Sequence, residues 1–469
     1  MKTVVIAFLA LLQPVCGHSQ ASINLQAAQN LPSAPVPQLP PNLTAPNATP
    51  AGQQSSDPQI NPVAPVSLSL KQAEALAVRN NPQISVARLT ALASQQVTRE
   101  VRSSLWPSAT ADLTGVDSRD NSRITAGGLN NPIIFQRAAA GVVVNQLIAD
   151  FGRTTNLVSS AGLEAKAEDQ NAVATKEQIL LTVDQAFYGA LQAHAVLTVA
   201  QQTVNARQTV ADQIGALFNS KLKSQLDFSF ANVNLAQAKL LLLDAENNEN
   251  AALATLAMVL GYPQTQNFQL VEDTTAISAP PGNVDDLIAQ AFATRPELLS
   301  LEFQHQSAQK FQTAERDLLL PDIRAIGVVG DTPVRNPLLS NWYGAVGVNV
   351  EIPIFNGFLY TARSREASLR AQATQGRLLD LRNRISRDVR TSWLNASTAY
   401  QRVSVAQQLL DQASLALDLA QTRYNLGLSS IVELSQAQLQ QTQAQIGNAQ
   451  AGYDYRLALA VLRYQTVGI

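Results

Sequence analysis

The chain has 469 residues, of which 14% are charged, and its formal net charge is −2. This balance argues against a general nucleic-acid binder, which would carry a basic excess. The three histidines, at positions 18, 194 and 305, do not pair with Cys or Asp at ligand spacing, so we expect no metal site. There is no Walker loop, and no constellation of catalytic residues stands out. We therefore expect no enzyme, no cofactor and no nucleic-acid partner.

The first 21 residues have the features of a secretory signal peptide. Lys2 provides the positive start, an apolar core follows from Thr3 to Leu12, and small residues near Ser19 offer a cleavage site. About ten apolar residues are too few to span a bilayer, which needs roughly 20. Cys16 is the single cysteine. It either leaves with the signal or carries a lipid.

Residues 22–66 form a separate zone of composition. Ten of the 22 prolines lie between Pro32 and Pro65, and Asp57 is the only charged residue between Ala21 and Leu70. Such a segment cannot bury enough apolar surface to form a core. We expect a disordered or polyproline-like linker.

Proline is absent from 133–262 and from 354–469, and both tracts are rich in helix-forming residues. Mainly apolar residues recur in alternating steps of four and three from Ile179 to Phe218 and again from Val389 to Tyr424. The exceptions within these two seams are Arg207 in the first and Gln407, Ser414 and Gln421 in the second. This 3.5-residue period is typical of helices packed as coiled coils. A helix from Arg153 to about Phe218 would be roughly 100 Å long.

Ahead of each long helix the hydrophobic period changes to two. Residues 108–119 and, more loosely, 135–151 alternate, and so do 322–330 and 342–355. These lengths of about 9–13 residues suit a tilted strand that crosses a bilayer. We expect β-hairpins at 108–151 and 322–355. Aromatic residues at the strand ends fit an interfacial girdle, although a few also occur there by chance: Trp342, Tyr343, Phe355, Phe358 and Tyr360.

The two halves of the chain match each other in sequence. At an offset of 214, Pro107 falls on Pro321, and each proline is expected to end a helix and begin a strand. Past the hairpins the offset is about 205, and Gly152 meets Gly357 at the boundary between strand and long helix. We therefore predict two structural repeats, 67–262 and 284–469, joined by a connecting segment, 263–283.

Four strands cannot close a membrane barrel, because bacterial barrels begin at about eight strands. An open sheet edge in lipid would leave unpaired backbone groups, each costing several kcal/mol. If the strands enter a membrane, several chains must share one barrel. The alternative is an exported coiled-coil interaction protein that forms no pore.

Four motifs carry a resemblance to a known family: "LP" at 320–321, "PIFNG" at 353–357, "RYNLGLSSIVELSQAQ" at 423–438 and "YDYRLALAVL" at 453–462. With the repeat, they make residues 67–469 resemble the TolC-like outer membrane efflux protein family. The resemblance implies a mainly α fold with a small β part. Three chains would form a shared 12-stranded transmembrane barrel, four strands from each, and a coiled-coil tunnel in the periplasm. It also implies contact with outer-membrane lipid, a periplasmic adaptor (membrane fusion) protein and an inner-membrane pump, for efflux or type I secretion.

Two turns carry acidic residues at capping-box spacing, Ser224 with Asp227 and Ser430 with Glu433. One interpretation is that each pair simply starts a helix. The resemblance adds that these turns lie at the periplasmic tip, where Asp227 and Glu433 of each protomer would ring the entrance. Both interpretations can hold. If the tip closes by packing, the expected residues are apolar ones in the second turn: Leu428, Ile431 and Leu434.

Overall fold

The computed structural model describes residues 66–117, 125–126, 129–130, 137–264, 268–272, 277–335 and 340–468. The expected signal peptide, Cys16 and all of the expected linker except Val66 lie outside these residues. Within them, no helix combines the length and the apolar character that a membrane crossing requires.

One order of elements occurs twice along the chain: two short helices, two strands, a long helix and a further helix. The first set is α1 (Leu70–Asn80), α2 (Pro82–Ser103), β2 (Ser108–Val116), β5 (Arg137–Ala149), α3 (Arg153–Asn219) and α4 (Gln225–Val259). The second is α5 (Val284–Thr294), α6 (Pro296–Arg316), β7 (Asp322–Val334), β8 (Trp342–Glu351), α7 (Leu359–Asn425) and α8 (Ile431–Thr466). Helices α3 and α7 each have 67 residues.

Prolines set the start of one helix in each set. Pro82 and Pro296 occupy the first turn of α2 and α6, each after a residue in extended conformation. Proline suits this position because its missing N–H would have no partner in the first turn. Pro107 and Pro321 each immediately precede a strand, after the end of α2 and of the 3₁₀ turn Asp317–Leu319. Both prolines thus lie between a helical segment and a strand.

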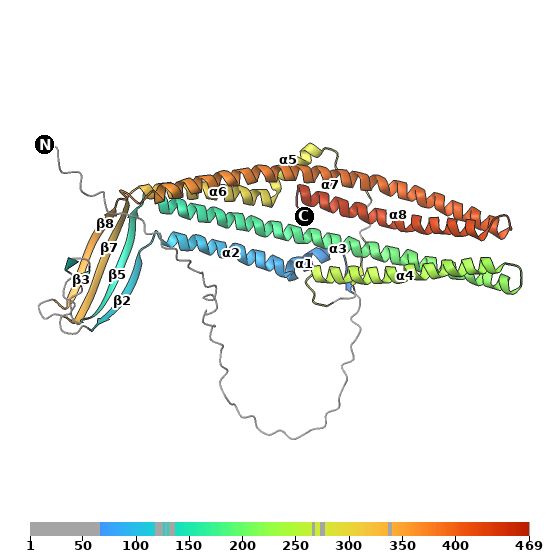
Figure 1. Cartoon of the computed structure of the whole chain (residues 1–469), viewed down its shortest axis with the longest axis horizontal. Helices are drawn as coiled ribbons and strands as arrows, with labels where there is room; N and C mark the ends of the chain where they lie inside the picture. The colour runs from blue at the N-terminus through green and yellow to red at the C-terminus, as the bar shows by residue number, and fades with distance from the viewer. Residues whose placement is uncertain are drawn as a thin grey trace, which may run out of the picture. The chain divides into compact units, whose positions relative to one another are not determined.

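The helices pack side by side as two long hairpins, α3 with α4 and α7 with α8 (Figure 1). Helix α3 also contacts α2, α6 and α8. Most of the predicted seam of α3 is buried: Ile179, Val183, Ala190, Ala200, Arg207, Ala211 and Ile214. In the seam of α7, Val389, Ala396 and Tyr424 are buried, whereas Tyr400, Gln407 and Gln421 are exposed in the single chain. The predicted helices are therefore confirmed, and the second seam is only partly covered.

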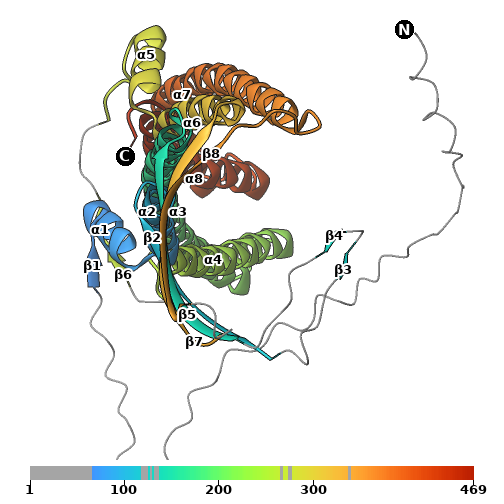
Figure 2. The ribbon, with the colours of Figure 1, turned by 90° about the vertical axis from the view of Figure 1, so that its left-hand side faces the viewer.

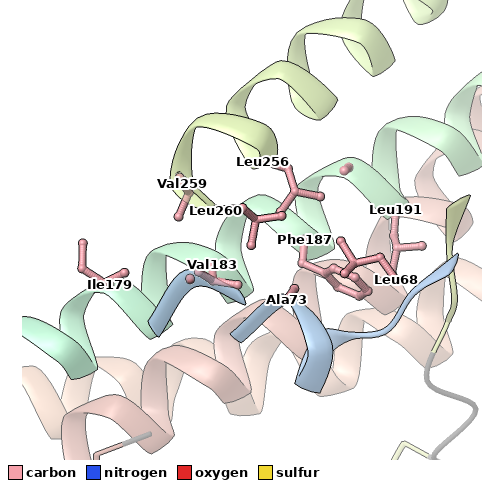
Figure 3. Close-up of a cluster of buried hydrophobic side chains, with 11 residues drawn as sticks. Leu68, Ala73, Ile179, Val183, Phe187, Leu191, Leu256, Val259 and Leu260 are labelled. Carbon is pink, nitrogen blue, oxygen red and sulfur yellow. The ribbon is translucent and has the colours of Figure 1, made fainter. Parts of the chain in front are cut away.

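A core lies where α1, α3 and α4 meet a short strand, β1 (Val66–Leu68) (Figure 3). Its largest members are Leu68, Phe187, Leu256 and Leu260, all almost fully buried. Strand β1 pairs in parallel with β6 (Phe268–Leu270). Neither strand was predicted from the sequence: β1 begins at Val66, the last residue of the expected linker, and continues into the first expected repeat, whereas β6 lies in the expected connecting segment. Three residues are too few to show a period of two.

The remaining four long strands form one antiparallel sheet in the order β2-β5-β7-β8. The sheet lies at the end of the helix bundle where α3 and α7 begin (Figure 1), and in Figure 2 its strands stand in front of the helices. The sheet contains two antiparallel hairpins, β2 with β5 and β7 with β8, whose strand ends differ from the expected ones. Strand β7 runs four residues beyond the expected 330, to Val334, and β8 ends at Glu351 rather than 355. The two-residue strands β3 (Thr125–Ala126) and β4 (Leu129–Asn130) pair within the first connection.

Candidate functional site

The four-stranded sheet has two chemically different faces. The register places Ala109, Val144, Gly327 and Val346 in one row across the sheet. Because side chains alternate along strands, one face carries mainly apolar residues: Leu113, Val142, Val144, Val329, Val346 and Val348. The other face carries most of the polar ones: Asp112, Asn145, Asp322, Arg324, Asn349 and Glu351. Val346 is 92% exposed in the single chain.

The sheet also has two unpaired edges. Strand β2 pairs only with β5, and β8 pairs only with β7, within the described part of the chain. An open edge offers a row of backbone donors and acceptors to another strand. An exposed apolar face next to open edges indicates a surface that another medium or another chain covers.

A turn with two residues in the left-handed region joins the sheet to each long helix. In the first, φ is 53° at Phe151 and 101° at Gly152. The Asp150 carboxylate accepts hydrogen bonds from the backbone N–H of Gly152 at 3.2 Å and of Thr154 at 2.6 Å. This arrangement supplies acceptors to the first turn of α3, as an N-cap does.

In the second turn, φ is 64° at Gly357 and 67° at Phe358. Gly152 is the residue directly before α3, whereas Phe358 has that place before α7. The glycines that sequence analysis matched are therefore one position apart in the structure. Both glycines lie between a strand and a long helix.

The first helix tip joins α3 to α4 through residues 220–224. Lys221 adopts the left-handed conformation, with φ of 63°. Ser224 starts α4, and its backbone N–H and its hydroxyl both donate to Asp227 Oδ2, at 3.1 and 2.7 Å. The Asp227 backbone N–H donates to the Ser224 hydroxyl at 3.2 Å. The expected capping box forms here.

The second tip, between α7 and α8, departs from that expectation. The Glu433 backbone N–H donates to the Ser430 hydroxyl at 3.4 Å, but the Glu433 carboxylate binds Arg423 Nη1 at 3.0 Å. A charge-assisted contact to a guanidinium competes well with a backbone N–H for one carboxylate. Leu217 occupies the position that matches Arg423 in the first tip, so Asp227 meets no such competitor. Arg423 opens the quoted motif at 423–438, but no sequence pattern predicted its contact with Glu433.

An apolar cluster ties the two tips together. Ile431 and Leu434, two of the three predicted packing residues, are buried there with Tyr424. From the other hairpin come Ala211, Ile214, Ala231 and Leu235. The third predicted residue, Leu428, is 68% exposed and lies outside the cluster. Tyr424 belongs to the predicted seam of α7, but its place beside Asp227 could be found only in three dimensions.

The chemistry around Tyr424 is set by burial and by nearby charges. Burial, together with the negative charge of Asp227, raises the pKa of Tyr424 to about 12. Lys223 Nζ lies 3.9 Å from the centre of the Tyr424 ring, within the range of a cation–π contact. Lys221, Lys223 and Arg423 therefore share the tips with Asp227 and Glu433. The tips carry mixed charge rather than a purely acidic surface.

No group of three or more His, Cys, Asp or Glu side chains in the described ranges is placed to hold a metal ion.

The description "Outer membrane efflux protein" belongs to a family model that matches residues 75–262 and 287–466. The chain belongs to the outer membrane efflux protein family. This outer membrane efflux protein is 23% identical to the outer membrane protein TolC of Escherichia coli over 82% of this chain and 81% of that one. It is 24% identical to the alkaline protease secretion protein AprF of Pseudomonas aeruginosa over 64% of each.

Among solved structures, the Campylobacter jejuni CmeC outer membrane channel matches 91% of this chain and 94% of its own, with a TM-score of 0.75 and 16% identity. That match establishes a common fold. The resemblance found in the sequence is thus confirmed, and with it the outer-membrane location and the mainly helical fold with a small sheet.

Proposed function

We propose that this outer membrane efflux protein is the passive exit duct of a tripartite efflux or type I secretion system. Three copies share one 12-stranded barrel, and their long helices form a tunnel in the periplasm. The single observation that carries this proposal is the two-faced sheet with two open edges. In lipid, such a sheet is stable only if neighbouring copies pair with both edges.

The faces of the sheet fit this arrangement. Residues such as Val346 and Val142 would meet lipid, and Asn145, Arg324 and Asn349 would line a watery interior. Alternation of this kind is typical of transmembrane β-strands. The division of the chain into repeats 67–262 and 284–469 would then give each protomer two hairpins of the barrel.

The tips would form the periplasmic entrance, where an adaptor and an inner-membrane pump dock. Asp227 and Glu433 of three protomers would ring the entrance, and Ile431 and Leu434 would hold the two hairpins of each protomer together. Leu428, exposed in one chain, would pack against a neighbouring copy. The duct itself would need no cofactor and would carry out no reaction.

Cysteine cross-linking across the open edges tests the proposal. One cysteine at Ala111 on β2 is combined with a second that is scanned along β8 from Gly344 to Val348. Cys16, the one native cysteine, is replaced by Ser. Oxidation should give covalent trimers for one or two positions only, because a barrel has a fixed register. In the control, the β2 cysteine replaces Asp112 instead of Ala111 and is combined with the same scan of β8. The β8 positions that cross-link should then shift by one residue.

Light scattering of the detergent-purified protein gives a second readout. A trimer is expected. A monomeric protein that fractionates away from membranes would overturn the proposal in favour of an exported coiled-coil protein without a pore.

A further inference from the structure

A polar cavity lies between the two helix hairpins, away from the sheet. Its volume is about 400 Å³, and side chains from α3, α7 and α8 line it. Six glutamines and three threonines are among them, and Arg207 is the only charged residue. Gln202, Gln213 and Gln421 are exposed, whereas Arg207 and Thr442 are buried, so the cavity opens to solvent. Apolar side chains make up only a small part of its lining. Its lining is therefore suited to a polar occupant.

Arg207 lies on the seam of α3, roughly three turns before that helix ends. Its side chain is nearly enclosed, since the residue is only 9% exposed. One nitrogen, Nη2, donates to the Thr442 hydroxyl of α8 at 3.3 Å. Burial lowers the pKa of Arg207 to about 10, so the guanidinium remains charged at neutral pH.

No carboxylate is found among the described residues that line the cavity. Asp212, one turn along α3 from Arg207, is exposed and accepts a hydrogen bond from the half-buried Gln208 at 2.8 Å. An enclosed charge without a counter-charge destabilises the folded protein. A guanidinium has five N–H donors in a fixed fork, and Thr442 uses one of them.

We propose that this cavity binds one small inorganic oxyanion, of the size of phosphate or sulfate, through Arg207 and Thr442. The planar fork of arginine matches two oxygens of such an anion. Glutamine amides and threonine hydroxyls supply further donors around it. The anion provides the counter-charge that the protein itself does not place in the cavity.

The walls of the site come from both hairpins. Arg207 and Gln202 belong to α3, and Gln438 and Thr442 belong to α8. A ligand held between them binds only while α8 stays packed on α3, so binding stabilises that packing. The proposal is independent of the barrel, and its failure would leave the proposed duct intact.

Equilibrium dialysis of the detergent-purified full-length protein against radiolabelled phosphate and, separately, sulfate tests the site. Ionic strength is held constant with sodium gluconate. We expect saturable binding of one anion per chain. Arg207→Gln should weaken binding by about tenfold or more, because it removes a hydrogen-bonding charge. Arg402→Gln, which changes an exposed arginine of α7, should leave binding unchanged.

Two further variants keep the test decisive if Arg207→Gln misfolds. Arg207→Lys retains the charge but loses the fork, and Thr442→Val removes the hydroxyl with little change in shape. Both should bind more weakly than the native protein. The proposal is overturned if the native protein shows no saturable binding, or if Arg207→Gln binds as well. Displacement by chloride at equal concentration would overturn the assignment to an oxyanion.

Discussion

Lys221, in the first helix tip, adopts the left-handed backbone conformation. This conformation costs a residue with a Cβ atom about 1 kcal/mol or more. Gly427 holds the equivalent place in the second tip, with φ of 75°. We expect Lys221→Gly to raise the free energy of unfolding by up to ~1 kcal/mol, measured by denaturant or thermal unfolding in detergent. The matched control, Gly427→Ala, should lower it. A loss of stability in Lys221→Gly would contradict the argument.

The two acidic tip residues should respond differently to removal of their charge. Asp227 accepts two hydrogen bonds from Ser224, whereas Glu433 makes an exposed ion pair. Asp227→Asn should cost about 0.5 kcal/mol, through a weaker cap and the lost interaction with the helix dipole. Glu433→Gln should cost less than ~0.5 kcal/mol, because exposed ion pairs contribute little. Thermal melting of each single variant measures this difference.

Single-channel recording of the double variant, Asp227→Asn with Glu433→Gln, tests the entrance ring. Cation preference should fall while the melting temperature changes only slightly. If melting falls and selectivity stays constant, the two residues are caps and the ring does not exist. If neither changes, closure by packing of Ile431 and Leu434 becomes the explanation to test.

At the scale of the helices, Asp184 is a buried acid in the interface of α3. Burial is the main cause that raises the pKa of Asp184 to about 7, and repulsion from the Glu74 carboxylate of α1 adds to it. The positive charge of Arg463 acts in the other direction and lowers this pKa. The folded protein therefore holds a proton that the unfolded chain releases at a pKa of about 3.9. Since the folded state binds more protons between these two pKa values, stability is highest below about pH 4 as far as this group is concerned. It falls as the pH rises to about 7 and then levels off.

We expect Asp184→Asn to remove this part of the pH dependence. At pH 8 it should raise the free energy of unfolding by on the order of 2 kcal/mol, because the amide needs no proton to stay neutral. At pH 4 the variant and the native protein should differ little. Unfolding curves between pH 4 and 8 check this, and Glu74→Gln should act in the same direction. A steeper pH dependence in Asp184→Asn would contradict the assignment.

Patterns within one element were enough to predict most of the elements. The 3.5-residue seam predicted a helix that ends at about Phe218, and α3 ends one residue later, at Asn219. Pro107 and Pro321 directly precede β2 and β7. The β1–β6 pair was missed because three residues carry no period. At the tips, the spacing of Ser224 and Asp227 predicted a box that forms. The same spacing of Ser430 and Glu433 does not produce a full capping box, because the folded turn brings Arg423 next to Glu433 and the two side chains form an ion pair.

On the scale of the whole molecule, the two faces of the sheet predict which substitutions membrane insertion tolerates. Val346 lies on the apolar face and Asn349 on the polar face of the same strand. Val346→Arg should cost about 2–4 kcal/mol if the residue meets the middle of the bilayer, and should lower the amount of trimer in the outer-membrane fraction. Asn349→Arg, the matched control, should be tolerated. Equal recovery of the two variants would argue against a lipid-facing Val346.

The uneven burial of the two seams has a consequence for the order of folding. The seam of α3 is covered within one chain, whereas Tyr400, Gln407 and Gln421 on the seam of α7 remain exposed there. The seam of α3 can therefore complete its packing in an isolated protomer, at a rate that does not depend on protein concentration. If three copies assemble as proposed, the last contacts of α7 must wait for an encounter between chains. Amide protons in the middle of α7 should accordingly gain protection from hydrogen exchange later than those of α3, and sooner when the protein is more concentrated.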